Sequence, residues 1–166
     1  MTPPAPSIDE SKLNSLILEM KSEQNFPLAI VAGLVAAIMG GVIWAIVTVS
    51  TGYQIGWMAV GVGFLVGISV RTLGKGLSKS YAYVGAFFAL FGCLLGNFLS
   101  IIGFVEMEEH IGYFQLLTSI DYKMIPEIMV STFQVMDLLF YGIAIYEGYR
   151  FSVRTISEER LAALAS

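Results

Sequence analysis

One uncharged apolar run, from Pro27 to Val49, constrains the fold more than any other feature of this sequence. A helix rises about 1.5 Å per residue, so this run matches the roughly 30 Å hydrocarbon core of a bilayer. Inside hydrocarbon the backbone must satisfy its own hydrogen bonds, which a helix does within a single segment. The run therefore predicts a transmembrane helix, and with it an all-α membrane protein.

Three further apolar runs follow, at Ile55–Val70, Tyr81–Phe104 and Ile128–Tyr146. Arg71 can snorkel, which extends the second run to Leu73. Hydrophobic residues make up 56% of the chain and charged residues 13%, against roughly 45–50% and 25% in soluble domains. We therefore predict a bundle of four transmembrane helices, with spans at about 27–49, 55–73, 81–104 and 128–149.

The basic residues predict the orientation of these spans. Those on one side of the predicted membrane are Lys12, Lys21, Arg71, Lys75, Lys79, Arg150, Arg154 and Arg160, and Lys123 alone lies on the other. Because Lys and Arg concentrate in cytoplasmic segments, we expect both termini inside. The chain then divides into a cytoplasmic tail (1–26), a membrane domain (27–149) with an outer loop (105–127), and a cytoplasmic C-terminal tail (150–166). Trp44, Tyr53 and Trp57 are expected at the outer interface.

Two shorter helices are expected outside the spans. Ser7 and Glu10 form a capping box before an amphipathic helix over about residues 8–24. That helix either lies on the membrane or a partner, or packs on its own bundle. In the outer loop we expect a short interfacial helix that ends before Asp121. The apolar residues of these two helical faces are Leu13, Leu16, Ile17 and Met20, and Met107, Ile111, Phe114 and Leu117.

Small residues recur at four-residue spacing along the first three predicted spans, which predicts closely packed backbones. These candidate packing residues are Ala29, Gly33, Ala37 and Gly41, then Ala59, Gly63 and Gly67, then Gly85, Gly92 and Gly96. The faces they form serve either packing within one chain or association between chains.

Asp137 is the one charged residue of the fourth apolar run. Gln134 and Tyr141 lie one helical turn to either side, and Asn97 of the third span lies at a matching depth. A carboxylate inside a membrane is costly unless it is paired or protonated. We therefore expect these four residues to form either a hydrogen-bonded clasp between helices or a site for a proton, ion or ligand.

The sequence lacks patterns for catalysis or cofactor binding. Cys93 and His110 are the only residues of their types. The stretch Glu106–His110 does not have the Glu-x-x-His spacing of di-iron bundles, and no nucleophile or nucleotide motif is present. We expect no metal, no cofactor, no nucleic acid and no enzymatic activity.

Two stretches of the sequence resemble a known group of proteins. Thr51–Trp57 continues through Gly61, Gly63 and Gly67, and Met136–Phe140 continues through Ala144 and Tyr146 to Arg150. The patterns TGYxIGWxxxGxGxxxG and MDLLFYxxAxYxGYR resemble a group of bacterial multi-pass membrane proteins without known activity. The resemblance implies a bacterial inner membrane.

From these features we expect a non-enzymatic membrane scaffold or interaction subunit, with the bilayer and a protein partner or further copies of the chain as its partners. The alternative is a small oligomeric channel or transporter that uses Asp137 with Asn97 and Gln134.

Overall fold

The computed structural model describes residues 10–109, 112–119, 121, 123, 125–156 and 160. The secondary-structure elements within these residues are all helices: α1 (Glu10–Ser22), α2 (Phe26–Thr51), α3 (Trp57–Gly74), α4 (Lys79–Glu109), α5 (Tyr113–Ser119), α6 (Ile125–Thr132) and α7 (Val135–Phe151). The predictions made for Ser7, His110 and Ile111 fall outside the described residues.

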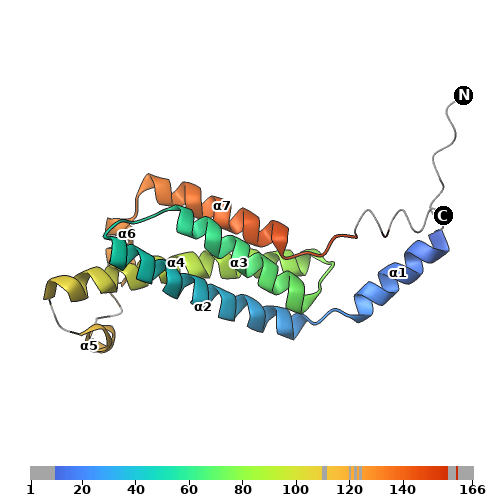
Figure 1. The fold of residues 1–166 in the computed structure, drawn as a ribbon, viewed down its shortest axis with the longest axis horizontal. Coiled ribbons are helices and arrows are strands. Elements are labelled where there is room, and N and C mark those ends of the chain that lie inside the picture. Colours follow the sequence, from blue (N-terminus) through green and yellow to red (C-terminus); the bar gives the residue numbers. More distant parts are fainter. Residues whose placement is uncertain are drawn as a thin grey trace, which may run out of the picture.

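Four helices form the bundle. α2 contacts α3 and α4, and α7 contacts the same two helices from the opposite side (Figure 1). α2 and α4 run in one direction, and α3 and α7 run back. We call the two ends of the bundle the Glu23 end, where α2 begins, and the Asp137 end, where α7 begins. α1 projects beyond the Glu23 end, whereas α5 and α6 lie at the Asp137 end (Figure 1).

Three helices, α2, α3 and α4, are long and apolar enough to cross a membrane. α6 and α7 pass the same test only as a pair bent by 107°, which would make a fourth, broken span. Large apolar side chains such as Val31, Ile46 and Phe87 point outward and are exposed. An apolar exterior of this kind suits lipid, so the structure indicates a multi-pass membrane protein.

Small residues occupy the contacts between these helices. The ten candidate packing residues, which are Ala29, Gly33, Ala37, Gly41, Ala59, Gly63, Gly67, Gly85, Gly92 and Gly96, are all buried. A Cβ on Gly63 would lie 2.5 Å from the Ala144 carbonyl oxygen of α7. One on Gly92 would lie 3.1 Å from the Ala37 carbonyl oxygen of α2. All ten therefore lie at helix contacts within a single chain.

The predicted continuous helix over 128–149 is wrong. The chain leaves helical geometry at Phe133 and Gln134, where Gln134 has the extended angles φ −104° and ψ 156°. Gln134 and Asp137 occupy the two positions of a capping box, in which the Asp137 carboxylate accepts the Gln134 N–H and the Asp137 N–H donates to the Gln134 backbone carbonyl. A capping box satisfies the donors at a helix start, so this pair favours a new helix at Val135 over continuation from α6.

The short helices also differ from expectation in their details. α4 extends to Glu109, so Met107 belongs to α4 and not to the outer helix. α5 does end before Asp121, but its buried residue is Leu116, whereas Phe114 is exposed. In α1 the residue that is fully buried is Met20.

Candidate functional site

The site begins with Asp137, the third residue of α7. One carboxylate oxygen, Oδ2, accepts the backbone N–H of Gln134 at 2.8 Å. The side chain is only 5% exposed. Because α7 begins at Val135, Asp137 lies in its first turn, at the end of the bundle where α7 starts. The Asp137 side chain therefore caps the start of α7.

A residue that sequence reasoning missed, Gln54, joins Asp137 to α4. It lies in the connection between α2 and α3, and its side-chain Nε2 donates to Asp137 Oδ1 at 3.5 Å and to Asn97 Oδ1 at 3.4 Å. No signal in the sequence indicated this role, because Gln54 is the unspecified position of the TGYxIGW pattern and a loop glutamine has no periodicity that would direct it to a partner.

Asn97 and Tyr141 complete the group. Asn97 is 3% exposed and donates through Nδ2 to the Tyr141 hydroxyl at 3.2 Å. That hydroxyl donates to the backbone carbonyl of Cys93 at 3.3 Å. We call Gln54, Asn97, Asp137 and Tyr141 the polar cluster. Gln134, which was expected within it, is exposed and occupies the N-cap position of α7 instead.

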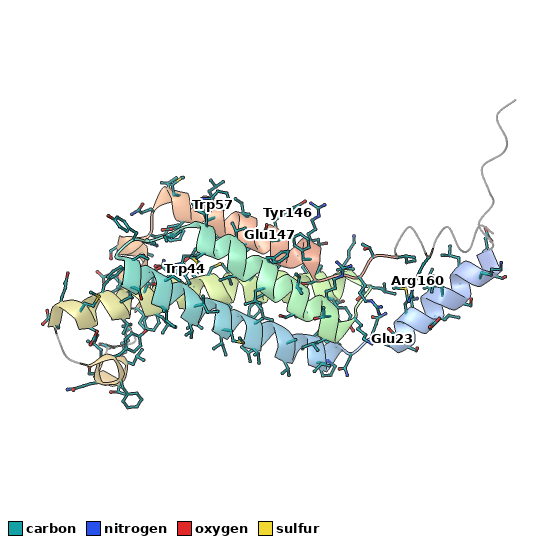
Figure 2. All side chains as sticks on the ribbon, viewed as in Figure 1. Glu23, Trp44, Trp57, Tyr146, Glu147 and Arg160 are labelled. Atoms are coloured by element: carbon teal, nitrogen blue, oxygen red, sulfur yellow. The ribbon has the colours of Figure 1, made fainter. Side chains whose placement is uncertain are left out.

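Two buried polar atoms on α2 lie beside the polar cluster. Trp44, which was expected at the outer interface, is 1% exposed and packs edge-on against Tyr141, with ring centroids 6.3 Å apart. Figure 2 shows it among the bundle helices. Its Nε1 and the Oγ1 of the buried Thr48, one turn further on, have no hydrogen-bond partner among the described residues. Gly96 of α4 leaves room for the Trp44 ring at this contact.

The polar cluster connects three segments that are distant in sequence: the α2–α3 connection, α4 and α7. Its donors and acceptors are directed mainly at one another, which is the arrangement of a clasp. On its Glu23 side the core is built from side chains such as Val62, Val66, Ala89 and Ala144, each at most 2% exposed. These residues separate the polar cluster from the Glu23 end.

A second acidic group, Glu147, directly follows the fourth apolar run and lies within α7. Its carbonyl oxygen would lie 3.2 Å from a Cβ on Gly67, a residue two turns inside α3. Its carboxylate Oε2 is buried and has no hydrogen-bond partner among the described residues.

At the Glu23 end, polar contacts hold three segments together. The Glu23 carboxylate accepts from Arg154 Nη1 at 2.8 Å and lies 3.7 Å from Lys75 Nζ. The pairing with Arg154, and then the nearby charge of Lys75, lowers the pKa of Glu23. Two backbone bonds join the same segments: Asn25 N–H to Gly74 O at 2.9 Å and Arg154 N–H to Gly76 O at 2.8 Å. We call this set of contacts the Glu23 clamp.

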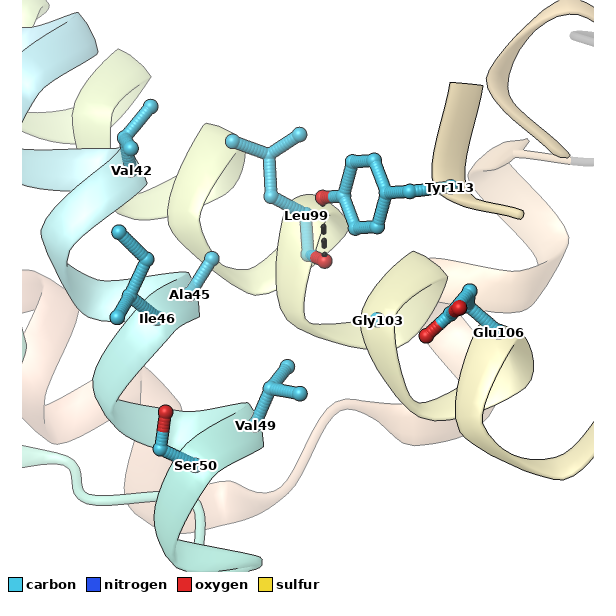
Figure 3. A pocket seen from close by; sticks show the side chains of 9 residues that line it. All are labelled: Val42, Ala45, Ile46, Val49, Ser50, Leu99, Gly103, Glu106 and Tyr113. Carbon is cyan, nitrogen blue, oxygen red and sulfur yellow. Dashed lines mark hydrogen bonds between the residues drawn. The ribbon is translucent and has the colours of Figure 1, made fainter. Parts of the chain in front are cut away.

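A groove of about 450 Å³ lies between α2, α4 and α5 near the Asp137 end (Figure 3). Its walls are mostly apolar, with Ser50, Glu106 and Tyr113 as the polar side chains. Tyr113 of α5 donates its hydroxyl to the Leu99 carbonyl of α4 at 3.0 Å. Burial raises the pKa of Tyr113, so the phenol stays a donor and holds α5 against α4.

No family model, no curated protein and no solved structure matches this chain. The resemblance to bacterial multi-pass proteins therefore stays a prediction.

Proposed function

We propose that this chain is a non-enzymatic scaffold or interaction subunit of a bacterial inner membrane, with four crossings and both termini in the cytoplasm. α2, α3 and α4 provide three crossings, and α6 with α7 provides the fourth. The basic residues support this orientation, because eight of the nine lie before α2, at the junction of α3 and α4, or at and beyond the end of α7. The Glu23 end would then face the cytoplasm.

The Glu23 clamp is the observation that carries the proposal. It fixes the α1–α2 junction, the α3–α4 turn and the segment after α7 relative to one another. A rigid surface made from three separate segments suits recognition of a partner better than loose tails do, because less ordering is required on binding.

The surface that contacts the partner lies on α1 in this proposal. Its Leu13, Leu16 and Ile17 are half-buried, and Met20 is buried, so most of the predicted apolar face is covered by the chain. Leu18 lies off that face and is 66% exposed. An exposed leucine on a helix that projects from the bundle (Figure 1) is the apolar anchor that we assign to a protein partner.

The transporter alternative has weaker support. Asp137 is engaged in a helix cap and in a bond to Gln54, at one end of the bundle. A carrier residue should instead reach both sides of the membrane, and the apolar side chains on the Glu23 side of the polar cluster oppose that. The arrangement supports the clasp interpretation of Asp137.

The test compares Leu18→Asp with Asn14→Asp in the full chain. Asn14 is an exposed residue one turn earlier on α1, so both variants add the same charge to the same helix. Wild type and Asn14→Asp should purify from native membranes in mild detergent with a stoichiometric protein partner, and Leu18→Asp should lose it. A partner-free ring that conducts ions in liposomes would contradict the proposal and favour the channel.

A further inference from the structure

Two adjoining hollows lie at the Glu23 end, and both are lined by Arg71 and Arg154. The first, of about 240 Å³, also involves Thr72 and Lys75. The second, of about 210 Å³, is completed by Met20, Thr155, Ile156 and Arg160. The two hollows therefore bring together cationic side chains from α3, the α3–α4 turn and the segment after α7. Figure 2 shows Glu23 and Arg160 at this end, between the bundle and α1.

The charge of this basic pair of hollows is only partly neutralised. Arg71, Lys75 and Arg154 supply three positive charges, and among the described residues Glu23 is the carboxylate that pairs with Lys75 and Arg154. Arg71 is half-buried, and its guanidinium has no ion-pair partner among the described residues. A guanidinium in that setting favours a bidentate oxyanion such as a phosphate.

The backbone holds these cations in place before any ligand arrives. α3 ends with Lys75 in the left-handed region, at φ 50°, and its N–H donates to the Arg71 carbonyl. The Arg154 N–H then donates to the Gly76 carbonyl at 2.8 Å. Arg71 and Arg154, the two arginines that line both hollows, therefore belong to segments that are bonded to each other. This reduces the ordering cost of binding.

We propose that these hollows bind the phosphate of an anionic phospholipid headgroup in the leaflet at the Glu23 end. Arg71 lies in the last turn of α3, and the neighbouring Leu73 is exposed and apolar. The cations thus stand at the boundary where headgroups meet acyl chains. Basic pockets between helices at that level are where anionic headgroups bind in membrane proteins. A lipid whose phosphate is held there can place its acyl chains beside α3. A soluble phosphate has no acyl chains and would not need this position.

The proposal requires only that the Glu23 end meet a bilayer surface, so it does not depend on the scaffold role. The experiment titrates phosphatidylglycerol, or phosphatidylcholine, into the full chain in detergent and counts retained lipids by native mass spectrometry. The variants are Arg71→Gln and, as the matched control, Arg150→Gln. Arg150 is an exposed cation at the same end that does not line either hollow.

Wild type should retain phosphatidylglycerol in preference to phosphatidylcholine. One basic residue near a membrane surface contributes about 1 kcal/mol, so Arg71→Gln should weaken this retention about fivefold, while Arg150→Gln leaves it unchanged. If Arg71→Gln does not fold, Arg160→Gln, which changes an exposed side chain of the second hollow, tests the same prediction: it should also weaken the retention of phosphatidylglycerol.

Equal losses in Arg71→Gln and Arg150→Gln would show a general surface potential and overturn the site. Equal retention of the two lipids by wild type would do the same. Two competition arms test the source of the phosphate. Displacement of the lipid by millimolar inorganic phosphate would assign the site to a soluble anion, and displacement by a polyglutamate peptide would assign it to an acidic protein; either result overturns the lipid proposal.

Discussion

The contact between α3 and α7 depends on Gly63, and replacing it with alanine tests whether the two backbones touch. A Cβ at this position would lie 2.5 Å from the carbonyl oxygen and 2.8 Å from the Cα of Ala144. Both are backbone atoms, so no side-chain rotation can relieve the overlap. Gly63→Ala must therefore push α7 away from α3.

Gly61 provides the matched control, because it lies on the same helix, is exposed, and a Cβ there meets nothing within 4 Å. Alanine is favoured over glycine in a helix by about 1 kcal/mol, and this gain applies to both variants. Overpacking costs about 1–3 kcal/mol and applies to Gly63→Ala alone. We expect Gly61→Ala to be up to about 1 kcal/mol more stable than wild type, and Gly63→Ala to range from unchanged to about 2 kcal/mol less stable.

The free energy of unfolding can be measured on purified protein in mixed micelles, by following helical circular dichroism as the fraction of SDS increases. The difference between the two variants should be about 1–3 kcal/mol, because the helix-propensity gain cancels. Equal unfolding midpoints for the two variants would mean that Gly63 faces lipid, and the arrangement of α3 and α7 described above would then be wrong.

Three more predictions concern the two ends of the bundle. Asp137→Asn keeps an acceptor for the Gln134 N–H and should unfold close to wild type, whereas Asp137→Leu should cost about 1–2 kcal/mol in the same assay. Because the pKa of Glu23 is lowered from its ordinary value of 4.5, its stabilising contribution is complete above that pH and is lost as the pH falls through the lower folded-state pKa; Glu23→Gln should remove this acid-dependent loss, and an unchanged pH profile would contradict the clamp. Single cysteines at Thr155 and Ser119 should be protected and reactive, respectively, towards an impermeant thiol reagent on intact cells, and the reverse pattern would invert the topology.

Helix location was predictable from sequence because hydropathy measures it directly. The uncharged run from Pro27 to Val49 lies within α2. The run from Tyr81 to Phe104 lies within α4, which continues through a charged segment to Glu109. Burial of small residues such as Gly63 and Gly92 was also foreseeable, because a four-residue spacing keeps them on one helix face. These features depend on local sequence and on the period of a helix.

The breaks and contacts that depend on single side chains were not predictable in the same way. Hydropathy does not register the restart at Val135, because Phe133 is apolar and Gln134 is one polar residue in an apolar run. Trp44 was assigned to an interface because tryptophan is common there, but the space left by Gly96 allows the ring inside the bundle. Gln54 reaches Asn97 and Asp137 only because the α2–α3 connection passes over them, which no local pattern encodes.

The restart of the helix changes the interpretation of Asp137. In a continuous helix over 128–149 its carboxylate would stand well inside the bilayer with neutral neighbours, and it would be a natural proton or ion carrier. At the third position of α7 it accepts the Gln134 N–H at 2.8 Å and lies within reach of Gln54. The carboxylate that caps α7 loses this bond when it moves away from the Gln134 N–H, so transport that requires Asp137 to move would disrupt the start of α7. Glu147, a second acidic group of α7, has no such commitment, because its buried Oε2 lacks a hydrogen-bond partner among the described residues. An assay of proton flux should therefore include Glu147→Gln beside Asp137→Asn, because a flux lost only in Glu147→Gln would place the carrier on α7 opposite Gly67 and leave the polar cluster as a clasp.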